Sequence, residues 1–346
     1  MIESIKFKNF KALQDTTLPL SPFTLLLGPN GSGKSTVLQA LQSVAQAHHG
    51  MYQALLSIGV EPAVDRSDLP LTEVQGSIQI DLNWKLDGEK VTTKVNLVGN
   101  RSERRHLDAQ GQELQNHSRA QMEERVGRIR TYSLEAAAIA QPVVLQPQVE
   151  LNPNGANFPG VLERLRDDEP ERFEALNKEV GRWLPEYDRI LFDTPNQGQK
   201  GFSLRTRAGK HRIPSWQLSQ GTLLAMAMLT LAYLPVPPVF IGLEEPDRGL
   251  HPRLLRHLRD ALYRLSYPES CGETRAPVQV LVTSHSPFLL DLYHDHPEEV
   301  VLARKAGLNV QFERLSERPN FEEILGDAPL SEVWYSGILG GVPSET

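Results

Sequence analysis

The sequence predicts an α/β fold in which a mostly parallel central sheet is covered by helices. Two observations lead to this prediction. A glycine-rich loop, GPNGSGKST at 28–36, stands between a short apolar run and a segment with helical spacing. From 239 to 303, apolar strand-like runs alternate with helix-like segments. Alternation of this kind is typical of parallel strands that are joined by helices packed on the sheet.

The N-terminal part of the chain adds antiparallel strands to this plan. The first ten residues alternate loosely between apolar and polar side chains, and the apolar run 23–27 leads into the glycine-rich loop. Apolar positions at helical spacing predict a helix over 37–47. Between 76 and 98, two alternating segments flank Asp87-Gly88, a strong hairpin signal. We therefore expect an antiparallel patch beside the parallel sheet.

The middle of the chain is more polar. Residues 101–130 hold seven arginines and five acids with few large apolar side chains, so we expect a solvated loop or helix there, as part of an insertion. Helical spacing over 173–183 predicts a helix that ends before Pro185. A strand hairpin is expected around 189–208, and a long apolar helix over 219–233.

The C-terminal part of the chain contains the alternating strands and helices from which the parallel sheet is predicted. We expect strands at 239–243, 278–283 and 300–303, with helices at 253–265 and 287–293 between them. These elements divide the chain into three parts: an N-terminal lobe with the glycine-rich loop at 1–100, a helical and β-hairpin insertion at 101–217, and a C-terminal lobe at 218–346.

Composition excludes several classes of protein. The 346 residues include 36 Lys and Arg against 43 Asp and Glu, a net charge of −7, so the chain does not coat nucleic acid through bulk charge. An apolar content of 40% excludes a disordered chain. The single cysteine, Cys271, excludes an internal disulfide and a cysteine-based zinc site. With no apolar run long enough to cross a membrane, we expect a cytoplasmic protein.

The glycine-rich loop matches the phosphate-loop pattern GxxxxGK[ST] in the strand-to-helix context that the pattern requires. Backbone N–H groups of such a loop surround phosphate oxygens, Lys34 reaches the β- and γ-phosphates, and the Ser35 hydroxyl binds Mg²⁺. The alternative is a degenerate loop that holds no nucleotide. The predicted nucleotide contacts are Gly28, Asn30, Gly31, Ser32, Gly33, Lys34, Ser35 and Thr36.

Two carboxylates follow the apolar strand 239–243. Open α/β sheets bind their ligands at the carboxyl ends of the strands, so we expect Glu244 to hold Mg²⁺ and Glu245 to activate the water that attacks the γ-phosphate. The alternative is a pair of ordinary exposed glutamates. His285 follows the next strand, at 278–283, and is expected to sense the γ-phosphate, although a lone histidine is often structural.

Four motifs in this order, GPNGSGKS, LSQGT, FIGLEEPDRGLHP and TSHSP, resemble the ABC-type ATPase heads of the SMC, RecF and OLD-nuclease group, often catalogued as AAA-family ATPases. The resemblance implies the ABC-ATPase form of the P-loop NTPase fold. It also implies that Ser219 and Gly221 of LSQGT contact ATP held by a second protomer. Asp247 and His251-Pro252 would face that protomer, and Gln141 and Gln146 are candidates for the glutamine loop.

The same resemblance implies a Mg²⁺-dependent ATPase that forms a homodimer, or a higher oligomer, on binding ATP. The implied settings are DNA repair or maintenance and anti-phage defence. OLD nucleases carry a Toprim domain after the ATPase, and the chain extends only about 60 residues beyond His285, so we expect a separate effector protein such as a nuclease. The alternative is an ATP-gated regulatory module without nucleic-acid contact. A small-molecule P-loop kinase is disfavoured by LSQGT, the signature motif of this group, and by His285.

One stretch of the chain is markedly basic. No acid occurs between Asp193 and Glu244, and its five hairpin cations are Lys200, Arg205, Arg207, Lys210 and Arg212. Two interpretations remain open. The cations contact a DNA backbone, or they pack against acids of the same chain, for which the acid-rich tail from Gln311 is a candidate.

Overall fold

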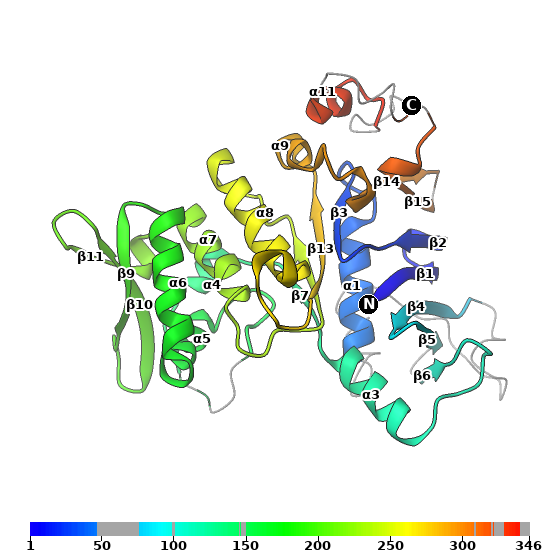
Figure 1. Ribbon diagram of the computed structural model, residues 1–346, viewed down its shortest axis with the longest axis horizontal. Coiled ribbons are helices and arrows are strands. Elements are labelled where there is room, and N and C mark those ends of the chain that lie inside the picture. Colours follow the sequence, from blue (N-terminus) through cyan, green and yellow to red (C-terminus); the bar gives the residue numbers. More distant parts are fainter. Residues whose placement is uncertain are drawn as a thin grey trace. The chain divides into compact units, whose positions relative to one another are not determined.

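The computed structural model describes residues 1–46, 76–98, 101–144, 146, 150–307, 309–319, 321 and 329–339. The chain forms two compact units (Figure 1). The first comprises 1–131, 238–242 and 277–346, and the second comprises 132–237 and 243–276. The boundaries of these two units differ from those of the three segments expected from the sequence. The division into three segments stays a prediction.

A six-stranded sheet carries the glycine-rich loop, in the order β15-β14-β3-β13-β12-β7. Strands β13 and β14 both pair in parallel with β3, while β15 is antiparallel to β14. The parallel centre predicted from the alternation is therefore confirmed. The strands are β3 (Phe23–Leu27), β7 (Ile129–Tyr132), β12 (Phe240–Glu244), β13 (Gln279–Ser284), β14 (Val300–Ala306) and β15 (Asn309–Arg314).

A second sheet in the first unit is antiparallel throughout, in the order β2-β1-β4-β5-β6. Asp87 and Gly88 join β4 to β5 with φ values of 49° and 87°, the left-handed pair that a tight hairpin turn requires. The predicted antiparallel patch is confirmed. Its strands are β1 (Ile2–Phe10), β2 (Leu13–Pro19), β4 (Ile78–Leu86), β5 (Glu89–Val98) and β6 (Arg101–Leu107).

The expectation of a solvated loop or helix at 101–130 is confirmed for α3 (Asn116–Gly127), in which only Met122 and Val126 are buried. It is wrong for 101–107, which form β6, the edge strand of the antiparallel sheet. Arg104 and His106 are 5% and 1% exposed, and both pair with Glu123 of α3, His106 at 3.3 Å. Arg104 also donates to the Val44 carbonyl oxygen at 3.0 Å. Burial lowers the pKa of His106. Polar residues can therefore lie inside the protein when the groups that they bind are buried with them.

Helix α1 (Lys34–Ala45) connects the two sheets of the first unit. Its apolar side chains join one buried cluster with residues of both sheets. Burying each such side chain stabilises the fold by about 1.5–3 kcal/mol, so the helix that starts at the glycine-rich loop is firmly held. The cluster includes Val37, Leu41 and Val44 of α1, Phe7 and Ile80 of the antiparallel sheet, and Leu26 and Leu281 of the parallel one.

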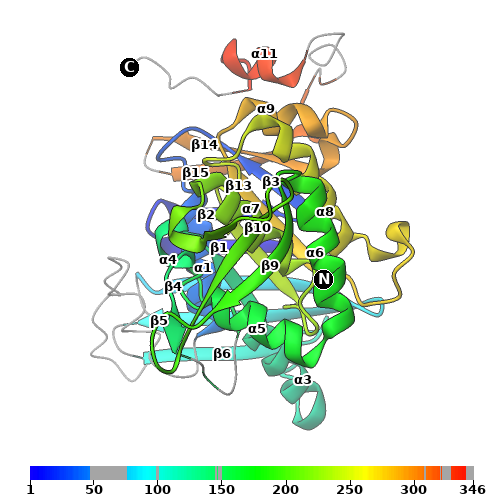
Figure 2. The ribbon, with the colours of Figure 1, turned by 90° about the vertical axis from the view of Figure 1, so that its left-hand side faces the viewer.

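The second unit combines helices with a small antiparallel sheet. Strand β10 pairs with β9, β11 and β8, and α6 lies beside β9 (Figure 2). The predicted hairpin and the helices at 173–183, 219–233 and 253–265 are confirmed. The elements are α4 (Ala136–Ile139), β8 (Val143–Val144), α5 (Phe158–Asp168), α6 (Pro170–Trp183), β9 (Tyr187–Asp193), β10 (Gln199–Thr206), β11 (Arg212–Pro214), α7 (Gln220–Leu231) and α8 (Pro252–Ser266).

Helix α7 is apolar on all sides and buried from Thr222 onward, which is typical of a helix inside a protein core. Two short helices, α9 (Pro287–Leu290) and α11 (Leu330–Tyr335), complete the first unit. No helix in the described part of the chain is both long enough and apolar enough to cross a membrane.

Candidate functional site

The glycine-rich loop leaves β3 and enters α1 directly. Gly33 precedes the helix with φ 85°, a conformation that L side chains rarely adopt. A Cβ atom on Gly33 would lie 2.9 Å from a Val310 methyl group, and one on Gly28 would lie 2.6 Å from the Ala303 carbonyl oxygen. Both glycines are therefore required for the loop to follow this path.

The loop concentrates hydrogen-bond donors. The Lys34 side chain is 6% exposed, and its Nζ donates to the carbonyl oxygens of Gly28 at 2.7 Å and Pro29 at 3.1 Å. The buried Ser32 Oγ has no hydrogen-bond partner among the described residues. Asn30, Gly31 and Ser35 are exposed, and Thr36 is half-buried. A buried ammonium group and an orphaned hydroxyl suit the phosphate groups of a nucleotide.

His285 lies beside the start of this loop. In the parallel pair of β13 and β3, Ser284 is opposite Leu27, so the next residues, His285 and Gly28, leave the sheet at the same edge. The Ser284 Oγ accepts from the Ser286 backbone N–H at 2.9 Å, which fixes the turn. The His285 side chain is exposed. The predicted position of the histidine at the phosphate-loop edge agrees with this register.

The acidic pair borders a cavity in the second unit. Glu244 ends β12, and both Glu244 and Glu245 are half-buried. Glu245 has φ 42°, a left-handed conformation that is uncommon for residues other than glycine. Residues in such conformations are concentrated at functional sites. The cavity has a volume of about 590 Å³. Its lining includes Tyr132, Glu135, Gln220, Glu244, Glu245 and Arg248.

Neither glutamine proposed for the glutamine loop lines this cavity. The segment that does so is 132–137, which follows β7. Gln141 instead donates to the Ala137 carbonyl oxygen at 3.3 Å, and Gln146 lines a different cavity. Sequence reasoning missed Glu135 and Arg248. Their positions in the sequence could have identified them. Glu135 lies three residues after the end of β7, and Arg248 lies three residues after Glu245.

The signature segment forms the start of α7. The Ser219 Oγ accepts a hydrogen bond from the Thr222 backbone N–H at 3.2 Å and caps the helix, as expected for serine at this position. Gly221 packs closely on the turn after the acidic pair, since a Cβ there would lie 2.7 Å from the Gly249 carbonyl oxygen. The signature and the turn containing Asp247 are thus in contact within the second unit.

The donor set for Mg²⁺ is small. The described residues contain no group of three or more His, Cys, Asp or Glu side chains suited to a metal ion. The predicted ligands are one hydroxyl, of Ser35, and one carboxylate, of Glu244. Mg²⁺ prefers such oxygen ligands and usually completes its shell with water and substrate phosphates. Each is thus a suitable type of donor, but Ser35 belongs to the first unit and Glu244 to the second, and a magnesium site that combines them stays a prediction.

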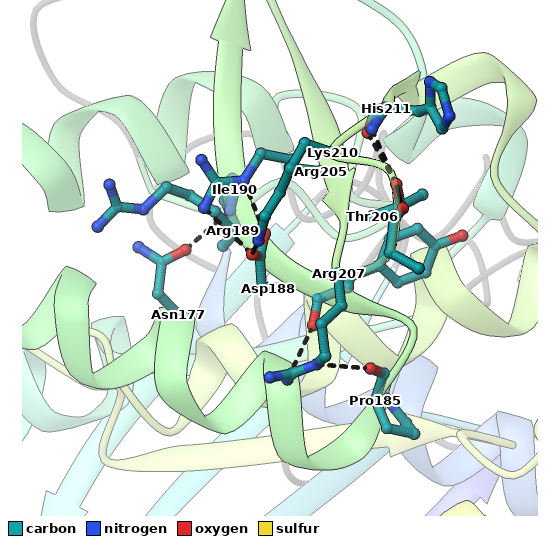
Figure 3. Close-up of polar contacts among 12 residues, drawn as sticks. Asn177, Pro185, Asp188, Arg189, Ile190, Arg205, Thr206, Arg207, Lys210 and His211 are labelled. Atoms are coloured by element: carbon teal, nitrogen blue, oxygen red, sulfur yellow. Dashed lines mark hydrogen bonds and ion pairs between the residues drawn. The ribbon is translucent and has the colours of Figure 1, made fainter.

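Four of the five hairpin cations pair with carboxylates of the second unit, and Figure 3 shows the contacts of Arg205 and Lys210 with Asp188. Arg205 contacts both oxygens of Asp188, at 2.7 and 3.2 Å, and Lys210 contacts the same carboxylate at 2.5 Å. Hydrogen bonds from Arg205 and then Lys210 hold the pKa of Asp188 well below its usual value. Asp188 therefore stays ionised and neutralises charge on the hairpin.

The other hairpin cations are engaged as well. Lys200 pairs with Glu163 at 3.0 Å and Arg212 with Asp193 at 2.8 Å. Arg207 donates to backbone carbonyl oxygens at the end of α6, including that of Pro185 at 3.0 Å (Figure 3). These contacts favour the second interpretation of the basic stretch. The acids come from α5 and β9, however, and the tail from Gln311 supplies none of these pairs.

Comparison with known proteins places the chain in a family. The model of the family described as "AAA domain, putative AbiEii toxin, Type IV TA system" matches residues 23–291. An OLD nuclease from Thermus scotoductus is 23% identical over 330 residues, and the match covers 84% of this chain and 60% of that protein. The chain thus spans less than two thirds of that relative's length.

Solved structures of SMC heads share the fold. An Smc head bound to the C-winged helix domain of ScpA has a TM-score of 0.59 at 14% identity, covering 90% of this chain and 97% of that one. A head with a coiled coil from Pyrococcus yayanosii has a TM-score of 0.57 at 11% identity, covering 94% and 98%. The α/β fold with a mostly parallel and an antiparallel sheet is therefore the fold of an SMC head.

Proposed function

Because the chain belongs to this AAA-domain family, we propose that it is a Mg²⁺-dependent ATPase head, two copies of which close around ATP and separate after hydrolysis. The observation that carries the proposal is the phosphate loop. Gly28 and Gly33 admit no side chain, Lys34 is buried with its ammonium group against the loop, and the Ser32 hydroxyl is orphaned. This arrangement suits a triphosphate.

The chain's own residues divide the work of phosphoryl transfer. Lys34 exchanges the carbonyl oxygens of Gly28 and Pro29 for the β- and γ-phosphates, and backbone N–H groups of 31–36 surround the remaining oxygens. Ser35 and Glu244 would hold a magnesium ion, which would neutralise phosphate charge. Glu245 orients the attacking water and accepts its proton. His285 donates to the γ-phosphate and so distinguishes ATP from ADP.

The second protomer completes the site. Ser219 and Gly221 present the N-terminus of α7, whose backbone N–H groups and dipole favour a phosphate. In this proposal they contact the γ-phosphate of ATP bound to the other copy, while Asp247 and His251-Pro252 face that copy. The close contact between Gly221 and Gly249 supports a role for both segments as one surface. ATP then stabilises the dimer because it binds both copies.

A Glu245→Gln variant tests this proposal. Loss of a positioned base lowers the rate by about 10²–10⁴-fold, so hydrolysis should nearly stop while ATP binding persists and a dimer accumulates. Phosphate release, ATP titration calorimetry and light scattering measure the three quantities. Glu186→Gln, which changes an exposed glutamate in the turn before β9, is the matched control. Full activity of the Glu245→Gln variant would contradict the assigned base.

The biological role of the protein depends on which effector protein the ATPase head controls. The Thermus scotoductus relative is named a nuclease, which supports a nuclease as the effector. We propose that this effector is a separate protein and that the pair acts in DNA maintenance or anti-phage defence. DNA is then a partner of the assembly. Purified chain alone should leave DNA intact in Mg²⁺, and cleavage by the chain would contradict a separate effector.

A second candidate function is an ATP-gated module that controls a protein partner without touching DNA. The paired cations of the hairpin favour it. Two similar SMC heads were solved bound to parts of the protein ScpA, which supports protein partners for this fold. An ATPase assay with and without single- and double-stranded DNA separates the candidates, because only a DNA-controlled head is stimulated.

A further inference from the structure

One tryptophan differs from the other three. Trp216 is 56% exposed, whereas Trp84, Trp183 and Trp334 are at most 5% exposed. All four tryptophans of the chain lie in its described part. Leaving a large apolar ring in water is unfavourable by about 25 cal/mol for each Å². Phe288 and Tyr335 are also largely exposed, at 58% and 65%, but among these three aromatic side chains only Trp216 lies beside the LSQGT segment.

The segment around Trp216 has the composition of an interface. Residues 215–222, SWQLSQGT, contain no charged side chain, yet Trp216, Gln217, Ser219 and Gln220 are all exposed. Centres of protein interfaces are depleted of charge and enriched in tryptophan. The hairpin that precedes this segment, in contrast, is rich in ion pairs. The surface at the start of α7 is thus suited to contact with another macromolecule.

We infer that Trp216 is an anchor residue of the closed dimer and is buried by a second copy of this chain. The inference rests on the proposed function, in which Ser219 contacts the nucleotide of the other copy. Three residues of extended chain span at most about 10 Å, so Trp216 lies within that distance of Ser219. A side chain this close to the trans contact meets the protein that holds the nucleotide.

Local geometry keeps the ring beside the signature. Ser215 is fully buried, and its Oγ donates to the Ala140 carbonyl oxygen at 2.7 Å. Leu218 is 8% exposed. These two side chains anchor the short helix 215–217 on both sides of Trp216, so the indole is presented on a fixed backbone. A preorganised aromatic residue loses little conformational entropy when a partner covers it.

Collisional quenching tests the inference directly, because acrylamide reaches Trp216 and not the three buried tryptophans. Without nucleotide, about one tryptophan in four should be quenchable. With Glu245→Gln and saturating MgATP, or wild type with a non-hydrolysable ATP analogue, the quenchable fraction should fall to near zero as the mass doubles. Trp216→Phe should remove the quenchable fraction in both states, which confirms the source of the emission.

Truncation provides the energetic test. Trp216→Ala should weaken the ATP-bound dimer by about 30-fold or more, the loss typical of an interface anchor, with unchanged ATP affinity of the monomer. Val236→Ala, which trims an apolar side chain that is 74% exposed, should leave the dimer unchanged. Trp216→Phe should restore most of the affinity.

The outcomes separate this inference from the proposed function. If the mass never doubles with ATP, the ATP-bound dimer is wrong and the anchor role falls with it. If the mass doubles while Trp216 stays quenchable, or if Trp216→Ala dimerises like wild type, the head mechanism stands and the anchor role alone is overturned.

Discussion

Two regions of this molecule concentrate positive charge and N–H donors: the phosphate loop at 28–36 and the hairpin at 187–214. In the loop, Lys34 donates to the neutral carbonyl oxygens of Gly28 and Pro29. In the hairpin, Arg205 and Lys210 share the carboxylate of Asp188. A carbonyl leaves the net charge of a cation intact, whereas a carboxylate cancels it.

This difference matters more than the number of cations. A phosphate group can replace a neutral acceptor and gain the full attraction of the ammonium charge, but it must compete with a carboxylate for a paired guanidinium. The single lysine of the loop is therefore better suited to an anion than the four hairpin cations that pair with carboxylates. Arg207 is the exception, because it donates to carbonyl oxygens and keeps its net charge. Three expected outcomes, from the largest to the smallest, would break or sharpen this comparison.

Lys34→Ala should lower the affinity for ATP by about a hundredfold or more, since it removes charge-assisted hydrogen bonds to the phosphates worth about 1.5–3 kcal/mol each. Titration calorimetry with MgATP measures the change. Lys210→Ala removes an equal charge from the hairpin and should leave ATP affinity unchanged. Equal losses in the two variants would contradict the distinction between the regions.

Gly221→Ala should destabilise the second unit by about 1–3 kcal/mol, the usual cost of forcing a methyl group into a packed site, because its Cβ would lie 2.7 Å from the Gly249 carbonyl oxygen. Thermal unfolding followed by circular dichroism measures the loss, and ATPase activity should fall with it. Gly127→Ala is the control, since a Cβ there has no neighbour within 4 Å. An unchanged melting temperature for Gly221→Ala would show that the turn at Gly249 can move to accommodate a methyl group at little cost.

Asp188→Asn should lower the melting temperature by a few degrees at pH 7. Arg205 and Lys210 hold the pKa of Asp188 below its unfolded value of about 3.9. Ionised Asp188 therefore stabilises the fold above about pH 4, and this stabilisation is lost as the pH falls further. The difference between wild type and variant should shrink on acidification. A difference that is the same at pH 7 and pH 3 would argue against an electrostatic role.

The phosphate loop was predictable from the sequence because its determinants are local. Glycines, Lys34 and Ser35 are contiguous, and the flanking strand and helix have clear apolar patterns. The parallel strands were predictable for the same reason. Roles for Glu244, Glu245 and His285 stay predictions, although the register of β13 places His285 at the edge where the loop begins.

The remaining features depend on residues far apart in the sequence. Strand β6 looked solvated because the partner of Arg104 and His106, Glu123, lies on a later helix. The sequence left two interpretations of the hairpin open because its partners Glu163 and Asp188 precede the acid-free stretch. Composition within a window counts charges, but it does not show which of them are already paired.

Glu245 illustrates a conflict between stability and chemistry at a single position. Its φ of 42° costs about 1 kcal/mol or more for a residue with a Cβ, and glycine would adopt it without that cost. A redesign that scores backbone conformation alone would therefore place glycine at position 245, and the protein would lose its proposed base. Screens for thermostable variants of this chain need to hold position 245 constant.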